Sequence, residues 1–154
     1  MLECNNTMTY EQILDTHGTL ICTIKGVSML PLLRQDKDVP IIKKKGLHRC
    51  NKYDVVLFKR KNGQYVLHRI LKVKKNNYWI VGDNCISGEY VHEEQILGIL
   101  TSIIRDDKTL PVTSLLYNVY VQTWCRFYPV RFFLLHCRSY VYRLVFLLKR
   151  HIKK

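Results

Sequence analysis

The chain has 154 residues, 47% of them hydrophobic, and a formal net charge of +13. This length allows one domain with a real core and excludes two full domains joined by a linker. The N-terminal segment has neither the basic region nor the apolar core of a signal peptide, so we expect no secretory leader and no N-terminal membrane anchor.

The first predicted element is a short helix. Thr9 followed by Gln12 is the pattern of a capping box, which predicts a helix through Leu14 that ends before Gly18. The following sequence is rich in β-branched and aromatic residues, with turn signals at Asn62-Gly63 and 76–77. We expect strands over 20–25, 39–42, 53–58, 65–73, 78–81 and 96–104. The predicted fold is mainly β (a β-rich α+β class), with a small antiparallel, coiled sheet.

The charge distribution divides the chain. All 12 acidic residues lie at or before Asp107, whereas the last 47 residues contain nine Lys or Arg and no acidic residue. We therefore predict a β domain over 1–107 and a basic, aromatic, helical extension over 108–154, broken into two helices at Pro129. Arginines inside this extension disfavour a membrane span, because each costs roughly 2.5 to 3.5 kcal/mol near the bilayer centre. Two possibilities stay open: residues 112–154 lie on an anionic membrane surface, or they pack on the body.

Three separated side chains suggest a chemistry. Ser28 follows a predicted strand and precedes Pro31, which places its hydroxyl at the exit from a strand. His68 lies on a predicted strand whose face is mostly apolar, and burial there favours the neutral imidazole that can accept a proton. Asp83 follows the next strand in a Gly-Asp-Asn turn. A hydroxyl, an imidazole and a carboxylate are the groups that a serine nucleophile mechanism requires.

Four ordered blocks over residues 20–104 resemble the signal peptidase I / LexA-like serine peptidase superfamily. These blocks are Gly26-x-Ser28-Met29-x-Pro31, Asp54-Val55-Val56, His68-Arg69-Ile70 and Gly82-Asp83-Asn84. The histidine looks like the Ser-His-Asp branch found in the endoplasmic reticulum signal peptidase and its relatives. The resemblance implies a serine endopeptidase that cleaves a peptide or leader segment through an acyl-enzyme.

The resemblance assigns roles to individual residues. Ser28 is the implied nucleophile, His68 the implied base, and Asp83 or Glu89 the acid that orients the histidine. Glu89 is a candidate because, in this branch of the family, a second acid lies six residues beyond the Asp of Gly-Asp-Asn. Gly26, Met29 and Pro31 complete the nucleophile motif. The sequence does not decide between the two acids.

Two alternatives remain open. Gly26 stands where signal peptidases usually carry a hydroxyl that helps to stabilise the oxyanion, and such a donor is worth roughly 3 kcal/mol of barrier. The fold could therefore serve as a non-catalytic peptide-binding module. The second alternative, a LexA-like self-cleaving regulator, needs a lysine base, but Lys59 and Lys72 lie in the wrong blocks.

The cysteine and lysine patterns bear on cofactors, compartment and partners. The six cysteines have no C-x-x-C or zinc-ligand spacing, so we expect reduced thiols, no bound metal and no organic cofactor. Reduced thiols are typical of cytoplasmic proteins, so we expect a cytoplasmic location. If the extension binds lipid, the protein should lie on the inner face of the membrane. Lysine runs at 43–45, 59–61 and 72–75 lie beside predicted turns and strand ends, where lysines protect sheet edges. We expect a peptide or protein substrate and no specific nucleic acid; the sequence does not indicate the oligomeric state.

Overall fold

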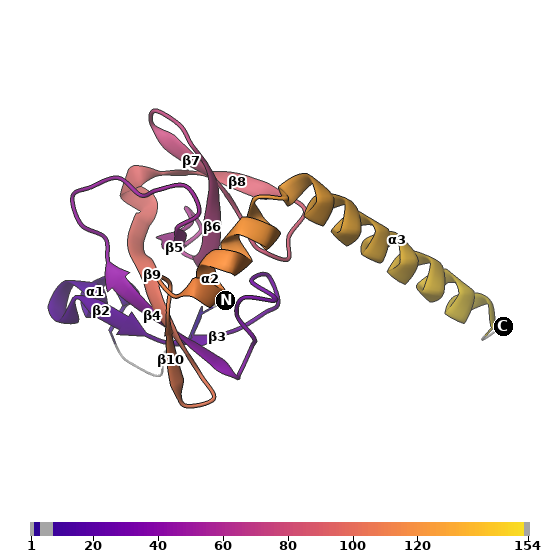
Figure 1. Ribbon diagram of the computed structural model, residues 1–154, viewed down its shortest axis with the longest axis horizontal. Helices are drawn as coiled ribbons and strands as arrows, with labels where there is room; N and C mark the ends of the chain where they lie inside the picture. The colour runs from indigo at the N-terminus through magenta and orange to yellow at the C-terminus, as the bar shows by residue number, and fades with distance from the viewer. Residues whose placement is uncertain (1, 4–7, 153–154) are drawn as a thin grey trace.

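The computed structural model describes the backbone of residues 2–3 and 8–152 and the side chains of residues 8–138, 140 and 141. Figure 1 shows a twisted sheet from which one long helix projects. The elements in chain order are β1 (Leu2–Glu3), α1 (Tyr10–His17), β2 (Thr19–Ile21), β3 (Thr23–Ile24), β4 (Asp38–Lys44), β5 (Val55–Lys59), β6 (Tyr65–Val73), β7 (Asn77–Val81), β8 (Gly88–His92), the short 3-10 helix η1 (Glu93–Gln95), β9 (Ile96–Arg105), β10 (Lys108–Pro111), α2 (Leu115–Tyr120), the π-helical turn η2 (Val121–Cys125) and α3 (Tyr128–Ile152).

One antiparallel sheet forms the body. Its strands follow the order β2-β4-β9-β5-β6-β7-β8, and β10 pairs with β9 beside this path. The strand register shifts in β4, in β5 and in β6. Such irregularities increase local twist and bend the strands. The fold is therefore the β-rich α+β arrangement with an antiparallel sheet that the sequence predicts.

The sheet buries side chains on both faces. In β5, Val55 and Leu57 pack in a cluster with α1, whereas Val56 and Phe58 pack in a second cluster with Ile70 of β6. This division follows from the two-residue period of a strand. Neighbouring residues of β6 therefore face different surroundings, which matters for the site described below.

Local sequence signals explain the first helix. Thr9 caps α1: its hydroxyl accepts a hydrogen bond from the Gln12 N–H, while the Gln12 side chain accepts one from the Thr9 N–H at 2.8 Å. Gly18 ends the helix with φ of 68°, a left-handed conformation that favours glycine. The predicted capping box and stop are both confirmed, although the helix continues to His17.

Several strands differ from their predicted bounds. The single strand expected over 20–25 is two short strands, β2 and β3, of which β3 pairs with β1 instead of joining the main sheet. β8 and β10 have no counterpart among the predicted strands. β10 pairs with β9 through residues 108–111, so the sheet extends past the boundary that the charge distribution places at residue 107.

The C-terminal extension is helical, as expected. α2 continues into η2, and α3 begins just before Pro129, which lies in its first turn, where a missing N–H is tolerated. α3 leaves the body and projects away from the sheet (Figure 1). Within the described part of the chain, no helix combines the length and the apolar character needed to cross a membrane.

The cysteines and lysines of the described residues have simple environments. Cys22, Cys50 and Cys125 are buried, Cys85 is half-buried and Cys137 is exposed, whereas Cys4 lies outside the described residues. Three lysines of the basic runs form ion pairs: Lys44 with Asp15 at 2.8 Å, Lys45 with Glu93 at 2.6 Å and Lys59 with Glu11 at 2.6 Å. These contacts tie strand ends to α1 and η1.

Candidate active site

Ser28 lies where the chain leaves β3 and turns, as the sequence predicts, and its side chain is half-buried. Gly26 precedes it with φ of 94°, and the Gly26 N–H donates to the Gln35 side chain at 2.8 Å. This left-handed conformation costs a side-chain-bearing residue energy. It explains why glycine, instead of a hydroxyl residue, stands two positions before Ser28.

The Gly-Asp-Asn turn packs directly on the Ser28 turn. The Asn84 backbone N–H donates to the Ser28 carbonyl at 2.8 Å, and the Asn84 side-chain amide donates to the Val27 carbonyl at 3.0 Å. Two segments more than fifty residues apart in sequence are thereby fixed in register.

Gly82 is the point at which the serine and histidine segments meet. A Cβ atom added at Gly82 would lie 2.7 Å from the Ser28 carbonyl oxygen and 3.0 Å from Nε2 of His68. Both distances are shorter than ordinary contacts, so no side chain fits there without displacing its neighbours. The glycine lets the Ser28 backbone and the His68 ring approach the same small volume.

The imidazole of His68 is held neutral by burial. Its side chain is 9% exposed, and the Phe58 ring packs edge-on with ring centroids 6.3 Å apart. Loss of hydration lowers the pKa of His68 to about 4, although the charge of Glu89 opposes this effect. A neutral imidazole at ordinary pH can accept a proton, as the sequence predicts.

Asp83 lies on the other side of this arrangement. Its carboxylate is fully buried and accepts hydrogen bonds from Arg69 Nε at 2.8 Å, Arg69 Nη2 at 2.7 Å and the Tyr120 hydroxyl at 2.9 Å. Among the described contacts there is no hydrogen bond between Asp83 and His68. The carboxylate that we expected to orient the histidine instead neutralises Arg69.

Glu89 also has a different partner. It forms a bidentate ion pair with Arg60, whose Nε lies 2.9 Å and 3.1 Å from the two carboxylate oxygens. No described hydrogen bond joins Glu89 to His68. Its charge nevertheless raises the pKa of His68 more than the charge of Asp83 does. Of the two candidate acids, Glu89 is the one that acts more strongly on the imidazole.

No protein-family model and no curated protein matches this chain. Within the described side chains, no three His, Cys, Asp or Glu residues come close enough together to hold a metal ion.

The extension contributes contacts that the sequence motifs do not indicate. Trp124 donates from Nε1 to the Asp83 carbonyl at 3.1 Å, and Tyr128 donates from its hydroxyl to the Ile86 carbonyl at 3.2 Å. Arg138 of α3 donates to the Asn84 side-chain oxygen at 2.9 Å. The absence of acidic residues after Asp107 is the feature of the sequence that indicates acidic partners for the extension on the body.

Arg131 is the most unusual member of this contact. Its side chain is 1% exposed and lies 3.6 Å from an Asp83 oxygen, with the guanidinium 4.7 Å from the centroid of the Tyr128 ring. None of its three nitrogens has a hydrogen-bond partner among the described residues. Buried arginine thus secures α3 to the body mainly through the charge of Asp83.

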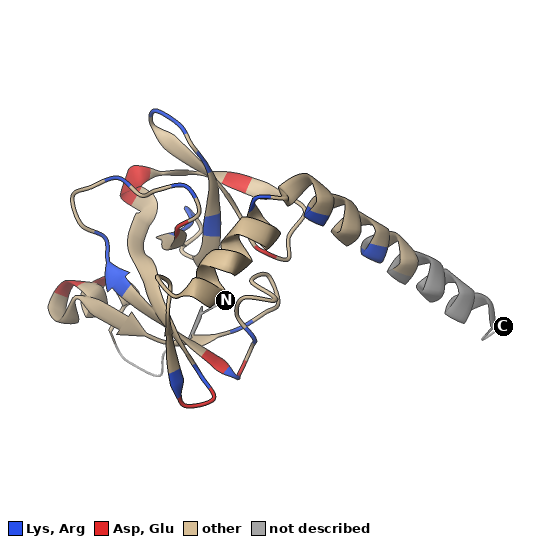
Figure 2. Cartoon of the chain, in the orientation of Figure 1, with Lys and Arg blue, Asp and Glu red and all other residues tan. Residues whose placement is uncertain are grey.

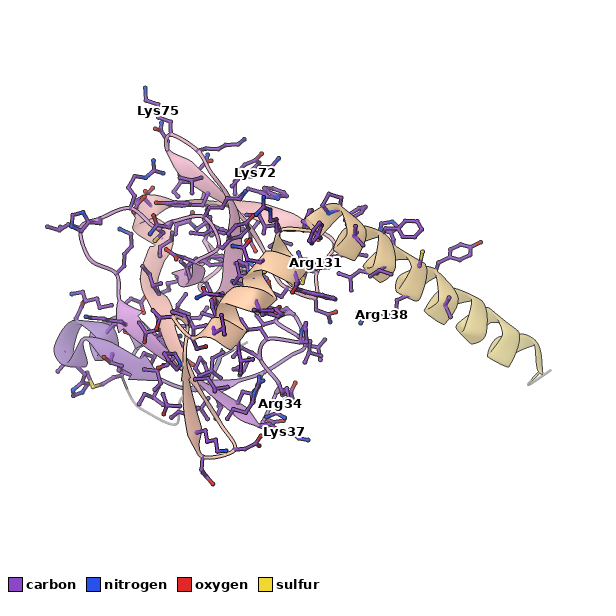
Figure 3. The ribbon with its side chains drawn as sticks, viewed as in Figure 1. Arg34, Lys37, Lys72, Lys75, Arg131 and Arg138 are labelled. Carbon is purple, nitrogen blue, oxygen red and sulfur yellow. The ribbon has the colours of Figure 1, made fainter. Side chains whose placement is uncertain are left out.

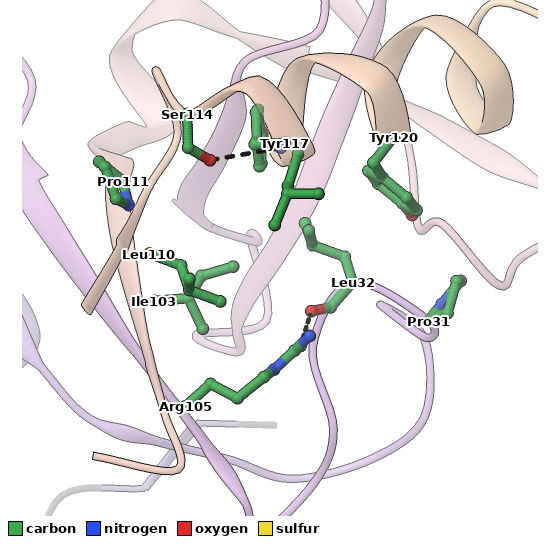
Figure 4. Close-up of a pocket in the computed structure, with 10 residues that line it drawn as sticks. Pro31, Leu32, Ile103, Arg105, Leu110, Pro111, Ser114, Tyr117 and Tyr120 are labelled. Carbon is green, nitrogen blue, oxygen red and sulfur yellow. Dashed lines mark hydrogen bonds between the residues drawn. The ribbon is translucent and has the colours of Figure 1, made fainter. Parts of the chain in front are cut away.

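A small pocket opens beside the loop that follows Ser28 (Figure 4). It has a volume of about 180 Å³ and lies between Pro31 and Leu32 of that loop, Leu110 of β10, and Tyr117 and Tyr120 of α2. Arg105 closes one side and donates to the Leu32 carbonyl at 2.6 Å. The lining is largely apolar and is built jointly by the body and the extension.

Proposed function

We propose that the chain is a serine endopeptidase of the signal-peptidase-like class. One observation carries this proposal: Nε2 of a neutral, buried histidine and the backbone of Ser28 converge on Gly82. Acyl transfer requires a serine hydroxyl within hydrogen-bond reach of a neutral base, and the convergence of these two segments supports that arrangement. The ordered sequence blocks that resemble the peptidase superfamily support the same function.

The proposed mechanism uses only side chains and backbone of this chain. The Ser28 hydroxyl attacks the scissile carbonyl while His68 Nε2 accepts its proton; His68 then protonates the leaving amine. Water hydrolyses the acyl-enzyme with His68 again as base. The Ser28 N–H stabilises the oxyanion, and Glu89 stabilises the imidazolium that forms. The cysteine spacing, which predicts no disulfide framework, supports action in the cytoplasm, and the proposed substrate is a peptide or a leader segment of a protein.

Labelling of Ser28 tests this proposal. A fluorophosphonate reagent should label the wild-type chain and fail to label Ser28→Ala, while the control Ser87→Ala, an exposed serine in the neighbouring loop, should label normally. His68→Gln should lower the labelling rate by about 100-fold or more, because the base is lost. Equal labelling of the wild-type and Ser28→Ala proteins would refute the assignment.

A second function is favoured by one specific observation. Neither Asp83 nor Glu89 hydrogen-bonds His68 among the described contacts, so the third member of a catalytic triad is not assembled. This arrangement supports a peptide-binding module that retains the fold. Such a module would bind peptides with similar affinity in the wild-type and Ser28→Ala proteins and would not react with the probe.

A further inference from the structure

Over the stretch of α3 whose side chains are described, basic side chains face the body and apolar side chains face away from it. One side carries Tyr128, Arg131, Leu135 and Arg138, and their contacts with Asp83, Asn84 and Ile86 turn this side toward the body. Figure 3 shows Arg131 and Arg138 on the same side of the helix. The arginines of a surface helix normally face water. Here they face the protein.

The opposite side of α3 is apolar and exposed. We define the outer face of α3 as Val130, Phe133, Leu134, Tyr140 and Val141, each of which is more than half exposed. The spacing of these residues places them along one side of a helix. A continuous row of exposed aromatic and aliphatic side chains on a projecting helix indicates a binding surface.

The charge of the extension identifies what covers this face. Residues 108–154 contain nine Lys or Arg and no acidic residue. Figure 2 shows basic residues and no acidic residue on the described part of α3. A second copy of the chain would bring two basic extensions together with no acid between them. An anionic lipid surface supplies both an apolar layer and negative headgroups.

We propose that the outer face of α3 docks on an anionic lipid bilayer, with the helix lying in the plane of the headgroups. Aromatic and aliphatic side chains then insert at the boundary between headgroups and acyl chains, while the net positive charge of the extension attracts the anionic surface. The helix lies on the membrane and does not cross it. This inference concerns docking and does not require the proposed peptidase activity.

Docking through α3 would also hold the candidate active site close to the membrane surface. Asn84 accepts a hydrogen bond from Arg138 of α3 and donates hydrogen bonds to the Val27 and Ser28 carbonyls. One residue therefore connects the docking helix to the nucleophile turn. If Ser28 is the nucleophile, its substrates are peptide segments at the membrane surface.

Vesicle sedimentation of the full chain tests the docking surface. We expect the wild-type protein to bind phosphatidylcholine vesicles containing about one third phosphatidylglycerol at least tenfold more tightly than pure phosphatidylcholine vesicles, because each Lys or Arg near an anionic surface contributes about fivefold. Phe133→Glu should weaken binding to the anionic vesicles by about tenfold or more. Asn76→Glu, in the exposed β6–β7 turn, is the matched control with the same change of charge and should bind as the wild type does.

A second measurement reports insertion directly. Cys137 is exposed on α3, so a polarity-sensitive dye attached to it in a Cys4→Ser background should shift to shorter wavelength with anionic vesicles. No sedimentation with anionic vesicles, or equal binding by Phe133→Glu and Asn76→Glu, would overturn the proposal. Lipid-free dimers that dissociate in Phe133→Glu would also overturn it and would assign this face to a second copy. Ser28→Ala should bind vesicles normally, which separates this test from that of the peptidase activity.

Discussion

His68 and Arg69 are adjacent on β6, and both are buried, yet their surroundings contrast sharply. Arg69 is fully enclosed, and its guanidinium hydrogen-bonds the Asp83 carboxylate, the Tyr53 carbonyl at 2.8 Å and the Tyr117 hydroxyl at 3.0 Å. His68 has an apolar neighbour in Phe58 and no described hydrogen bond. Buried polar groups are usually satisfied. The contrast separates a side chain that stabilises the fold from the one that we propose as a base.

The largest effect on stability is expected when the ion pair between Arg69 and Asp83 is broken. Asp83→Asn removes the charge that balances Arg69 and Arg131, so we expect the free energy of unfolding to fall by about 3 to 5 kcal/mol. Urea denaturation followed by circular dichroism measures this change. The triple variant Arg69→Met, Arg131→Met and Asp83→Leu should recover much of the loss, because none of these three buried charges then lacks a partner. A loss below about 1 kcal/mol in Asp83→Asn would contradict a structural role.

The next largest effect is a pH dependence on the His68 side. The pKa of His68 is about 4 in the folded chain, against an ordinary value of 6.5. Below pH 6.5 the unfolded chain binds a proton that the folded chain excludes. Stability should therefore fall by about 3 kcal/mol as pH decreases from 6.5 to 4. His68→Leu should lack this fall.

Asp38 provides an internal reference for that measurement. Its pKa is lowered to about 2 by hydrogen bonds from Arg105 and Arg34, although burial opposes the shift. The stability that this carboxylate contributes is lost between its ordinary pKa of 3.8 and about 2, below the window of His68. An unchanged pH profile between 6.5 and 4 in His68→Leu would show that another group titrates there.

The sequence predicts the parts of this site that depend on local signals. The turn at Ser28, the burial of His68 and the Gly-Asp-Asn turn all follow from nearby residues. The partner of Asp83 does not, because it depends on which face of β6 the turn reaches. His68 and Arg69 differ by one residue, and that single step moves a side chain from one face to the other.

The missed strands have the same kind of explanation. β8 carries Glu89 and Tyr90, and β10 begins with a lysine and ends at Pro111, so neither shows an apolar alternation. Their places are set by pairing with β7 and β9. The turn before β10 places Asp106 and Asp107 at φ of 48° and 60°, where glycine or asparagine is the usual signal.

A smaller effect is expected where the extension meets Asp83. Tyr120→Phe removes the hydroxyl that donates to the carboxylate at 2.9 Å, so the free energy of unfolding should fall by about 1.5 kcal/mol. Asp83 keeps both hydrogen bonds from Arg69, which is why the loss is smaller than in Asp83→Asn. Denaturation with urea measures it, with the exposed Tyr90→Phe as the control. Equal stability of the two variants would show that this hydroxyl contributes nothing.

The smallest effect on stability is expected for Glu89→Gln. Glu89 and Arg60 are 31% and 34% exposed, and partly exposed ion pairs contribute less than about 1 kcal/mol. The charge of Glu89 raises the pKa of His68. In the proposed peptidase, removal of this charge should therefore move the acid limb of kcat/KM to lower pH and reduce kcat by about tenfold or more, since the imidazolium loses its stabilising charge. Glu89→Gln should therefore lose activity while its free energy of unfolding stays nearly unchanged. In Asp83→Asn, by contrast, activity should fall only in proportion to the fraction of protein that remains folded. A Glu89→Gln enzyme with unchanged kcat and an unchanged acid limb would show that Glu89 serves only Arg60, and that both acids near the histidine are structural.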